Sequence, residues 1–86
     1  MTRFFFDTHD GVRAERDTDG VDLPNEAMAR SEAKAALTDM ARDHLPNGNH
    51  LELRVTIRDE AGDEIYTASL VLDVSTPRAR RRRTDA

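Results

Sequence analysis

Hydrophobic and polar residues alternate most strictly in the last third of the chain. Every second residue from Leu51 to Ile57 is aliphatic, and polar residues fill the positions between them. A period of two is typical of a strand with one buried face. Residues 59–63 form a polar loop with Gly62, and residues 65–74 again alternate, so the two segments predict an antiparallel hairpin.

The N-terminus predicts a second hairpin. Residues 3–9 contain three successive aromatic residues, Phe4 to Phe6, which favour a strand. Asp10-Gly11 is typical of a tight turn, and the polar segment 12–16 predicts a short return strand at an edge. Residues 17–23 are expected to form a loop.

A helix is predicted between the hairpins, from Pro24 to near Leu45, where Pro46-Asn47-Gly48-Asn49 ends it. Asn25 or Asp22 is expected to cap its first turn. One helical face carries mostly small or apolar residues: Ala29, Ala33, Ala36, Leu37, Met40 and His44.

The order ββαββ predicts an α+β fold, a four-stranded, mainly antiparallel sheet with one helix packed on one face. Residues 1–76 are expected to form a single domain and residues 77–86 a disordered tail. The predicted core consists of Phe4, Phe6, Ala33, Ala36, Leu37, Met40, Leu51, Leu53, Val55, Ile57, Tyr66, Leu70 and Leu72.

Charge is distributed unevenly along the 86 residues, whose net charge is −4. Residues 1–76 carry −8, which disfavours broad contact with nucleic acid, and the last ten residues carry +4. The absence of cysteine excludes disulfides and thiolate metal sites, and no apolar run approaches the roughly 20 residues of a membrane span. We therefore expect a cytoplasmic protein with no signal peptide and no membrane partner.

The segments Arg3-Phe4-Phe5-Phe6, His9-Asp10-Gly11 and Asp19-Gly20-Val21-Asp22-Leu23-Pro24, followed by an Ala-rich helix, resemble a family of small proteobacterial proteins of unknown function. The resemblance covers roughly residues 3–74, and the arginine tail is not part of it. It implies the fold given above and no activity.

The acidic segment 15–26 nearly matches a calcium-binding EF-hand loop, with carboxylates at positions one, three and five, glycine at six and glutamate at twelve. Position one is Glu15 where the loop normally has aspartate, and position eight is Asp22 where it has an apolar residue. The preceding element is a predicted strand where a helix is required. We therefore expect an acidic turn whose Asp22 and Glu26 act at the helix start.

Other constellations give no catalytic site. Asp7 and His9 share a strand face and, with Asp10, are candidates for metal or acid–base chemistry, but a metal site normally needs three or four convergent ligands. We expect neither a cofactor nor a metal, and a chain that is not an enzyme.

The sheet face away from the helix is the candidate interaction face. Aromatic and arginine side chains on an open sheet are typical of single-stranded RNA platforms, but a single aromatic residue and an acidic body favour self-association or plain solvation. The candidate residues of this face are Phe5, Arg54, Arg58, Ile65 and Val71.

The C-terminal cluster Arg78, Arg80, Arg81, Arg82 and Arg83 is the candidate nucleic-acid contact. The sequence as a whole predicts a small, uncharacterised binding or interaction module that is not an enzyme. Its partner is an unknown protein or a second copy of the chain. The alternative is a nucleic-acid-associated regulatory protein that uses the basic tail.

Overall fold

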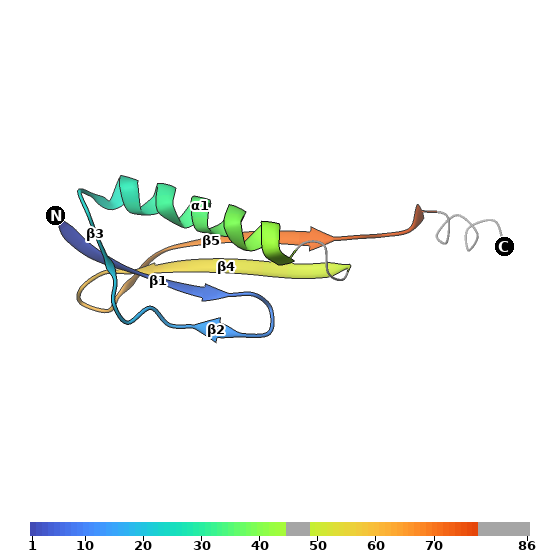
Figure 1. Cartoon of the computed structure of the whole chain (residues 1–86), viewed down its shortest axis with the longest axis horizontal. Helices are drawn as coiled ribbons and strands as arrows, with labels where there is room; N and C mark the ends of the chain where they lie inside the picture. The colour runs from blue at the N-terminus through green and yellow to red at the C-terminus, as the bar shows by residue number, and fades with distance from the viewer. Residues whose placement is uncertain (45–48, 78–86) are drawn as a thin grey trace.

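Secondary structure in the computed structural model follows the predicted order of hairpin, helix and hairpin; the structure describes residues 1–44 and 49–77 (Figure 1). In this part of the chain a helix packs against an antiparallel sheet, which confirms the α+β fold, although the sheet has five strands where the sequence predicts four. The elements are β1 (Thr2–His9), β2 (Ala14–Glu15), β3 (Val21–Leu23), α1 (Glu26–His44), β4 (His50–Arg58) and β5 (Glu64–Asp73). Within these residues, no helix combines the length and hydropathy that a membrane crossing requires.

The sheet has the strand order β2-β1-β4-β5, and β3 pairs with β1. The first strand of the chain therefore lies inside the sheet, where residues 5–9 of β1 pair antiparallel with β4. β2 lies opposite the end of β1 and β3 lies opposite its start. The loop expected over residues 17–23 is thus wrong in part, since a strand of three residues is too short to show a period in the sequence.

Helix α1 begins where Asn25 caps it. The Asn25 side-chain oxygen accepts a hydrogen bond from the Met28 amide at 2.9 Å, which satisfies one of the N–H groups left open at a helix start. Asp22, the other predicted cap, instead forms an ion pair at 3.0 Å with Arg3, because it lies on β3 directly opposite that residue. Glu26 pairs with Arg30 one turn along the helix.

The core lies between α1 and the face of β4 that the alternating residues 51–57 predict. Small residues on the helix let it lie close to the sheet, and Leu53, Val55 and Ile57 are completely buried beneath it. The buried hydrophobic residues are Phe4, Ala29, Ala33, Leu37, Ala41, Leu53, Val55 and Ile57. The predicted core omits two of these residues, Ala29 and Ala41. The half-buried Phe6, Ala36, Met40, Leu51 and Tyr66 of the predicted core pack against this cluster.

Strand β5 differs from its prediction at three positions: Ile65, Leu70 and Leu72. Leu72 belongs to the predicted core, but it is only half-buried and is not among the residues that pack against the buried cluster. Leu70 belongs to the predicted core but is 40% exposed, because β5 is the last strand of the sheet and α1 packs more against β4 than against β5. The pairing register of β5 shifts between Ile57 and Arg58, so Ile65 is inserted as a bulge and packs against the core. Ile65 therefore does not lie on the solvent-facing side as expected.

Candidate functional site

Arg58 is the most constrained side chain on the sheet face opposite the helix, and only 8% of it is exposed. Its Nε donates to Oδ2 of Asp7 at 2.6 Å, and its Nη2 donates to Oδ1 of the same carboxylate at 3.1 Å. Nη2 also donates to the backbone carbonyl of Asp17 at 2.8 Å. This bidentate geometry fixes the guanidinium plane and ties β4 to β1 and to the segment after β2.

The ring of Phe5 completes the same cluster. The Arg58 guanidinium lies over this ring, 5.0 Å from its centroid. The backbone of Gly20 also comes so close that a Cβ atom there would lie 2.9 Å from Cε2 of Phe5. Phe5 is therefore covered from within the molecule, which leaves it poorly placed to stack on a nucleic-acid base.

Asp17 holds the connecting segment in place. Its Oδ2 accepts a hydrogen bond from the Phe6 amide at 3.0 Å, and its Oδ1 accepts from the amides of Asp19 at 3.1 Å and Gly20 at 3.0 Å. The Asp17 amide donates to Oδ1 of Asp7 at 2.9 Å. We call Phe5, Asp7, Asp17, Gly20 and Arg58 the outer cluster.

These contacts keep the outer cluster ionised. Hydrogen bonding from Arg58 lowers the pKa of Asp7 below its ordinary value, against the opposing effect of burial. Burial raises the pKa of Asp17, but the amides of Phe6, Gly20 and Asp19 together outweigh it, so that this pKa also lies below the ordinary value. The carboxylate of Asp7 raises the pKa of Arg58. The cluster is therefore a charged network whose donors and acceptors satisfy one another.

The acidic segment 15–26 does not gather its carboxylates. Asp17 accepts backbone hydrogen bonds, while Asp22 and Glu26 form ion pairs with two different arginines. Within residues 1–44 and 49–77, no group of three or more histidine, aspartate or glutamate side chains is arranged to hold a metal ion. The segment connects β2, β3 and α1, so its backbone follows the sheet and cannot wrap around a cation as an EF-hand loop does.

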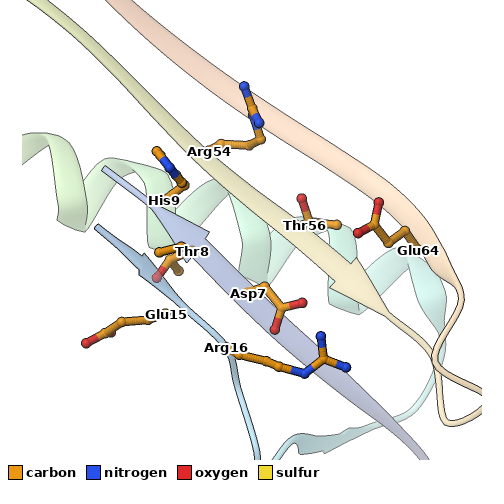
Figure 2. A pocket seen from close by; sticks show the side chains of 9 residues that line it. Asp7, Thr8, His9, Glu15, Arg16, Arg54, Thr56 and Glu64 are labelled. Atoms are coloured by element: carbon orange, nitrogen blue, oxygen red, sulfur yellow. The ribbon is translucent and has the colours of Figure 1, made fainter. Parts of the chain in front are cut away.

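A shallow groove of about 270 Å³ lies beside the outer cluster, between the segment around β2 and the outer face of β4 (Figure 2). In Figure 2 Arg16 extends toward Asp7, while Arg54 and Glu64 border the groove from the other side. Ligand pockets usually enclose roughly 300–1,000 Å³ and converge a few polar groups on one point. Here the Arg54 guanidinium is paired with Glu52 at 2.6 Å, Asp7 is paired with Arg58, and the lining carries charges of both signs.

The predicted acid–base candidates do not act together. Nδ1 of His9 accepts a hydrogen bond from the Gly11 amide at 2.9 Å, and Oδ1 of Asp10 accepts from the Val12 and Arg13 amides. Both side chains thus stabilise the turn after β1, while Asp7 belongs to the outer cluster.

The outer edge of β5 is open. Within the described part of the chain β5 pairs with β4 alone, and His50 lies opposite Asp73. The Val74 amide donates to the Asn49 carbonyl at 2.8 Å, so Val74 directs its backbone groups toward β4. Because this direction alternates along an antiparallel strand, the backbone N–H and C=O groups that point outward belong to Thr67, Ser69, Val71 and Asp73.

Apolar side chains accompany this open edge. Leu70 is 40% exposed, Val71 54% and Val74 47%. The segment from Tyr66 to Leu72 contains no charged residue, proline or glycine, and so lacks the features with which proteins usually protect sheet edges.

The predicted interaction face is therefore divided by the structure. Phe5 and Arg58 are used inside the outer cluster, and Ile65 turns toward the core. Arg54 and Val71 remain at the surface. The tail arginines, Arg78, Arg80, Arg81, Arg82 and Arg83, lie outside the described residues.

Comparison with known proteins shows the family of this chain. The family model described as a domain of unknown function, DUF6894, matches residues 3–71. No curated protein and no solved structure matches the chain. The matched range contains the outer cluster, the acidic segment and most of β5. The match agrees with the sequence analysis, in which the aromatic strand and the Leu23-Pro24 segment resemble a family of unknown function. The chain belongs to the DUF6894 family.

Proposed function

We propose that this domain is a non-enzymatic interaction module that binds a polypeptide strand at the open edge of β5. The observation that carries the proposal is the row of outward-pointing backbone groups on Thr67, Ser69, Val71 and Asp73, beside the exposed Leu70. An extended segment added to such an edge gains main-chain hydrogen bonds, and alternate side chains supply selectivity.

The use of the titratable groups supports a role without catalysis. A general acid or base needs a pKa near the working pH and a free path to its substrate. Asp7 and Asp17 instead have lowered pKa values, and their carboxylate oxygens already accept hydrogen bonds, those of Asp7 from Arg58 and those of Asp17 from backbone amides. The outer cluster acts as a structural support that holds one end of the sheet.

Backbone amide exchange tests the proposal directly. We expect the amides of Thr67, Ser69, Val71 and Asp73 to exchange rapidly in the dilute isolated protein. They should become protected in concentrated cell extract, while even-numbered amides of β5, already bonded to β4, change little. Equally rapid exchange of the outward amides in dilute solution, in extract and at high concentration of the chain itself would contradict binding at this edge.

A second candidate rests on the sequence. The last ten residues carry +4 beside a body of −8, which favours a nucleic-acid-associated regulatory protein that binds through its tail. Binding to nucleic acid that weakens steeply with salt and disappears when residues 77–86 are deleted would support this alternative. We also propose a cytoplasmic location for this protein and a proteobacterial origin for its family.

A further inference from the structure

We infer that the open edge of β5 pairs antiparallel with β5 of a second copy of this chain, with Leu70 facing Leu70 across a two-fold axis. This inference rests on the proposed function, because it names the strand that the edge receives. The observations that select a second copy are the self-complementary order of side chains along β5, the position of its charges and the contrast with the other end of the sheet.

The side chains of β5 match a copy of themselves when Leu70 lies on the axis. In this register Ala68 lies opposite Leu72, and Tyr66 lies opposite Val74, all on the face that α1 covers. The outward backbone groups of Ser69 meet those of Val71, so hydrogen-bonded pairs form where the open donors and acceptors lie. The exposed part of Leu70 is covered by its own counterpart.

Two features fix this register. The overlap runs from Tyr66, the first residue after the bulge at Ile65, to Val74, whose amide still donates to the Asn49 carbonyl. Asp73 then lies opposite Thr67, so that no carboxylates face each other directly. A register centred on Asp73 would place two like charges opposite one another, which is destabilising.

The other end of the sheet does not compete for this role. β2 has only two residues and is flanked by charged side chains, including Arg13 and Arg16. Short, charged edges resist pairing with another strand. Because the two-fold contact uses the same edge on both copies, association closes at a dimer and does not continue into a fibre.

The contact is small and the partners repel each other at long range. An edge pairing of this length lies below the area of stable interfaces, so we expect weak, reversible association. Residues 1–76 carry −8 on each copy, and salt screens that repulsion. Dimerisation should therefore strengthen as salt is added, opposite to the salt dependence of nucleic-acid binding.

The test follows the oligomeric state of the full 86-residue chain by sedimentation, from about 10 µM to about 1 mM, the range in which weak interfaces are populated. We expect a monomer–dimer equilibrium together with protection of the Thr67, Ser69, Val71 and Asp73 amides at high concentration. A wild-type chain that stays monomeric throughout, with these amides unprotected, overturns the inference.

Two charged variants test the register. Leu70→Lys and Leu70→Glu each place like charges opposite one another on the axis, and each should weaken dimerisation at least about tenfold, while an equimolar mixture should restore it as a heterodimer. Val12→Lys and Val12→Glu make the same charge changes at a residue that is 94% exposed in the turn after β1, and they should leave dimerisation unchanged. Circular dichroism confirms that each variant is folded. If either Leu70 variant dimerises as strongly as the wild-type chain, or if the equimolar mixture of the two stays monomeric, this register is overturned.

The same measurements separate the inference from the proposed function. A monomeric wild-type chain whose outward β5 amides become protected in extract refutes self-pairing and retains binding of a different polypeptide at the edge. A monomeric chain whose amides stay unprotected in extract refutes both.

Discussion

Replacing Asp17 by alanine should destabilise the domain more than the same replacement of any other carboxylate residue in the acidic segment 15–26. The change removes the acceptor of three backbone amides, those of Phe6, Asp19 and Gly20. The Asp19 amide is exposed and water can replace the lost oxygen, whereas the other two hydrogen bonds are partly buried. An unsatisfied buried donor costs about 1–3 kcal/mol. Since water partly reaches this half-buried segment, we expect a loss of about 2–4 kcal/mol for the two amides together.

This loss is large for a domain of this size, whose total free energy of unfolding should be about 4–13 kcal/mol. Urea denaturation measures it, with thermal unfolding as a second probe. At 4–8 °C per kcal/mol, the melting temperature should fall by at least about 8 °C.

Two further variants control the experiment. Asp19→Ala removes the same charge from an exposed side chain two residues away, and it should change stability by no more than about 0.5 kcal/mol. Asp17→Asn keeps one acceptor oxygen and should lie between the two alanine variants. If Asp17→Ala were no more destabilising than Asp19→Ala, the outer cluster would not hold the sheet as argued above.

Three other results are expected. Because the folded-state pKa values of Asp7 and Asp17 lie below the unfolded value, their contribution is present at neutral pH and is lost as pH falls below about 4; Asp7→Asn should lower stability at pH 7 and flatten its dependence on pH in acid urea titrations. Gly20→Ala should destabilise more than Gly62→Ala in the same assay: both glycines have positive φ, +76° and +90°, but a Cβ meets Phe5 and Arg3 only at the first. Equal losses would mean that backbone conformation alone matters. Asn25→Ala should cost about 0.5–2 kcal/mol as loss of a helix cap, measured by thermal unfolding, and Asp22→Ala should cost less; the reverse order would restore Asp22 as the cap.

The parts of the fold that were predicted correctly carry their signal in local periodicity. The alternating apolar side chains of β4 point toward α1, because one continuous helix covers that face of the sheet. Leu53, Val55 and Ile57 are all completely buried there. Leu70 follows the same alternation but lies on the last strand, where cover depends on how far α1 reaches. Its exposure depends on the placement of α1 in space and is therefore not encoded in the pattern of β5 itself.

The outer cluster was missed for a related reason. The alternation of β4 correctly assigns Arg58 to the face away from the helix, but its burial depends on Asp7 and Asp17, which lie 51 and 41 residues away. The bulge at Ile65 is equally invisible, since one inserted residue changes which face the side chain joins without changing composition. The available signal was the pair of aspartates, Asp7 and Asp17, on either side of the Asp10-Gly11 turn. Aspartate side chains near a turn often accept hydrogen bonds from the backbone, which is typical of an ordered loop.

The position of β1 inside the sheet has a consequence for the order in which the protein folds during synthesis. Among the strands of this domain β1 is made first, and its aromatic residues, Phe4 to Phe6, are made about fifty residues before their partner strand β4. In that interval β2 and β3 are the strands available to it, and both pair with it over short distances in sequence. Closing the long loop to β4 must come later, since distant contacts carry the larger entropy loss. A nascent chain stalled before residue 50 should therefore expose an aromatic strand to chaperones, and release of β4 and β5 should end that exposure.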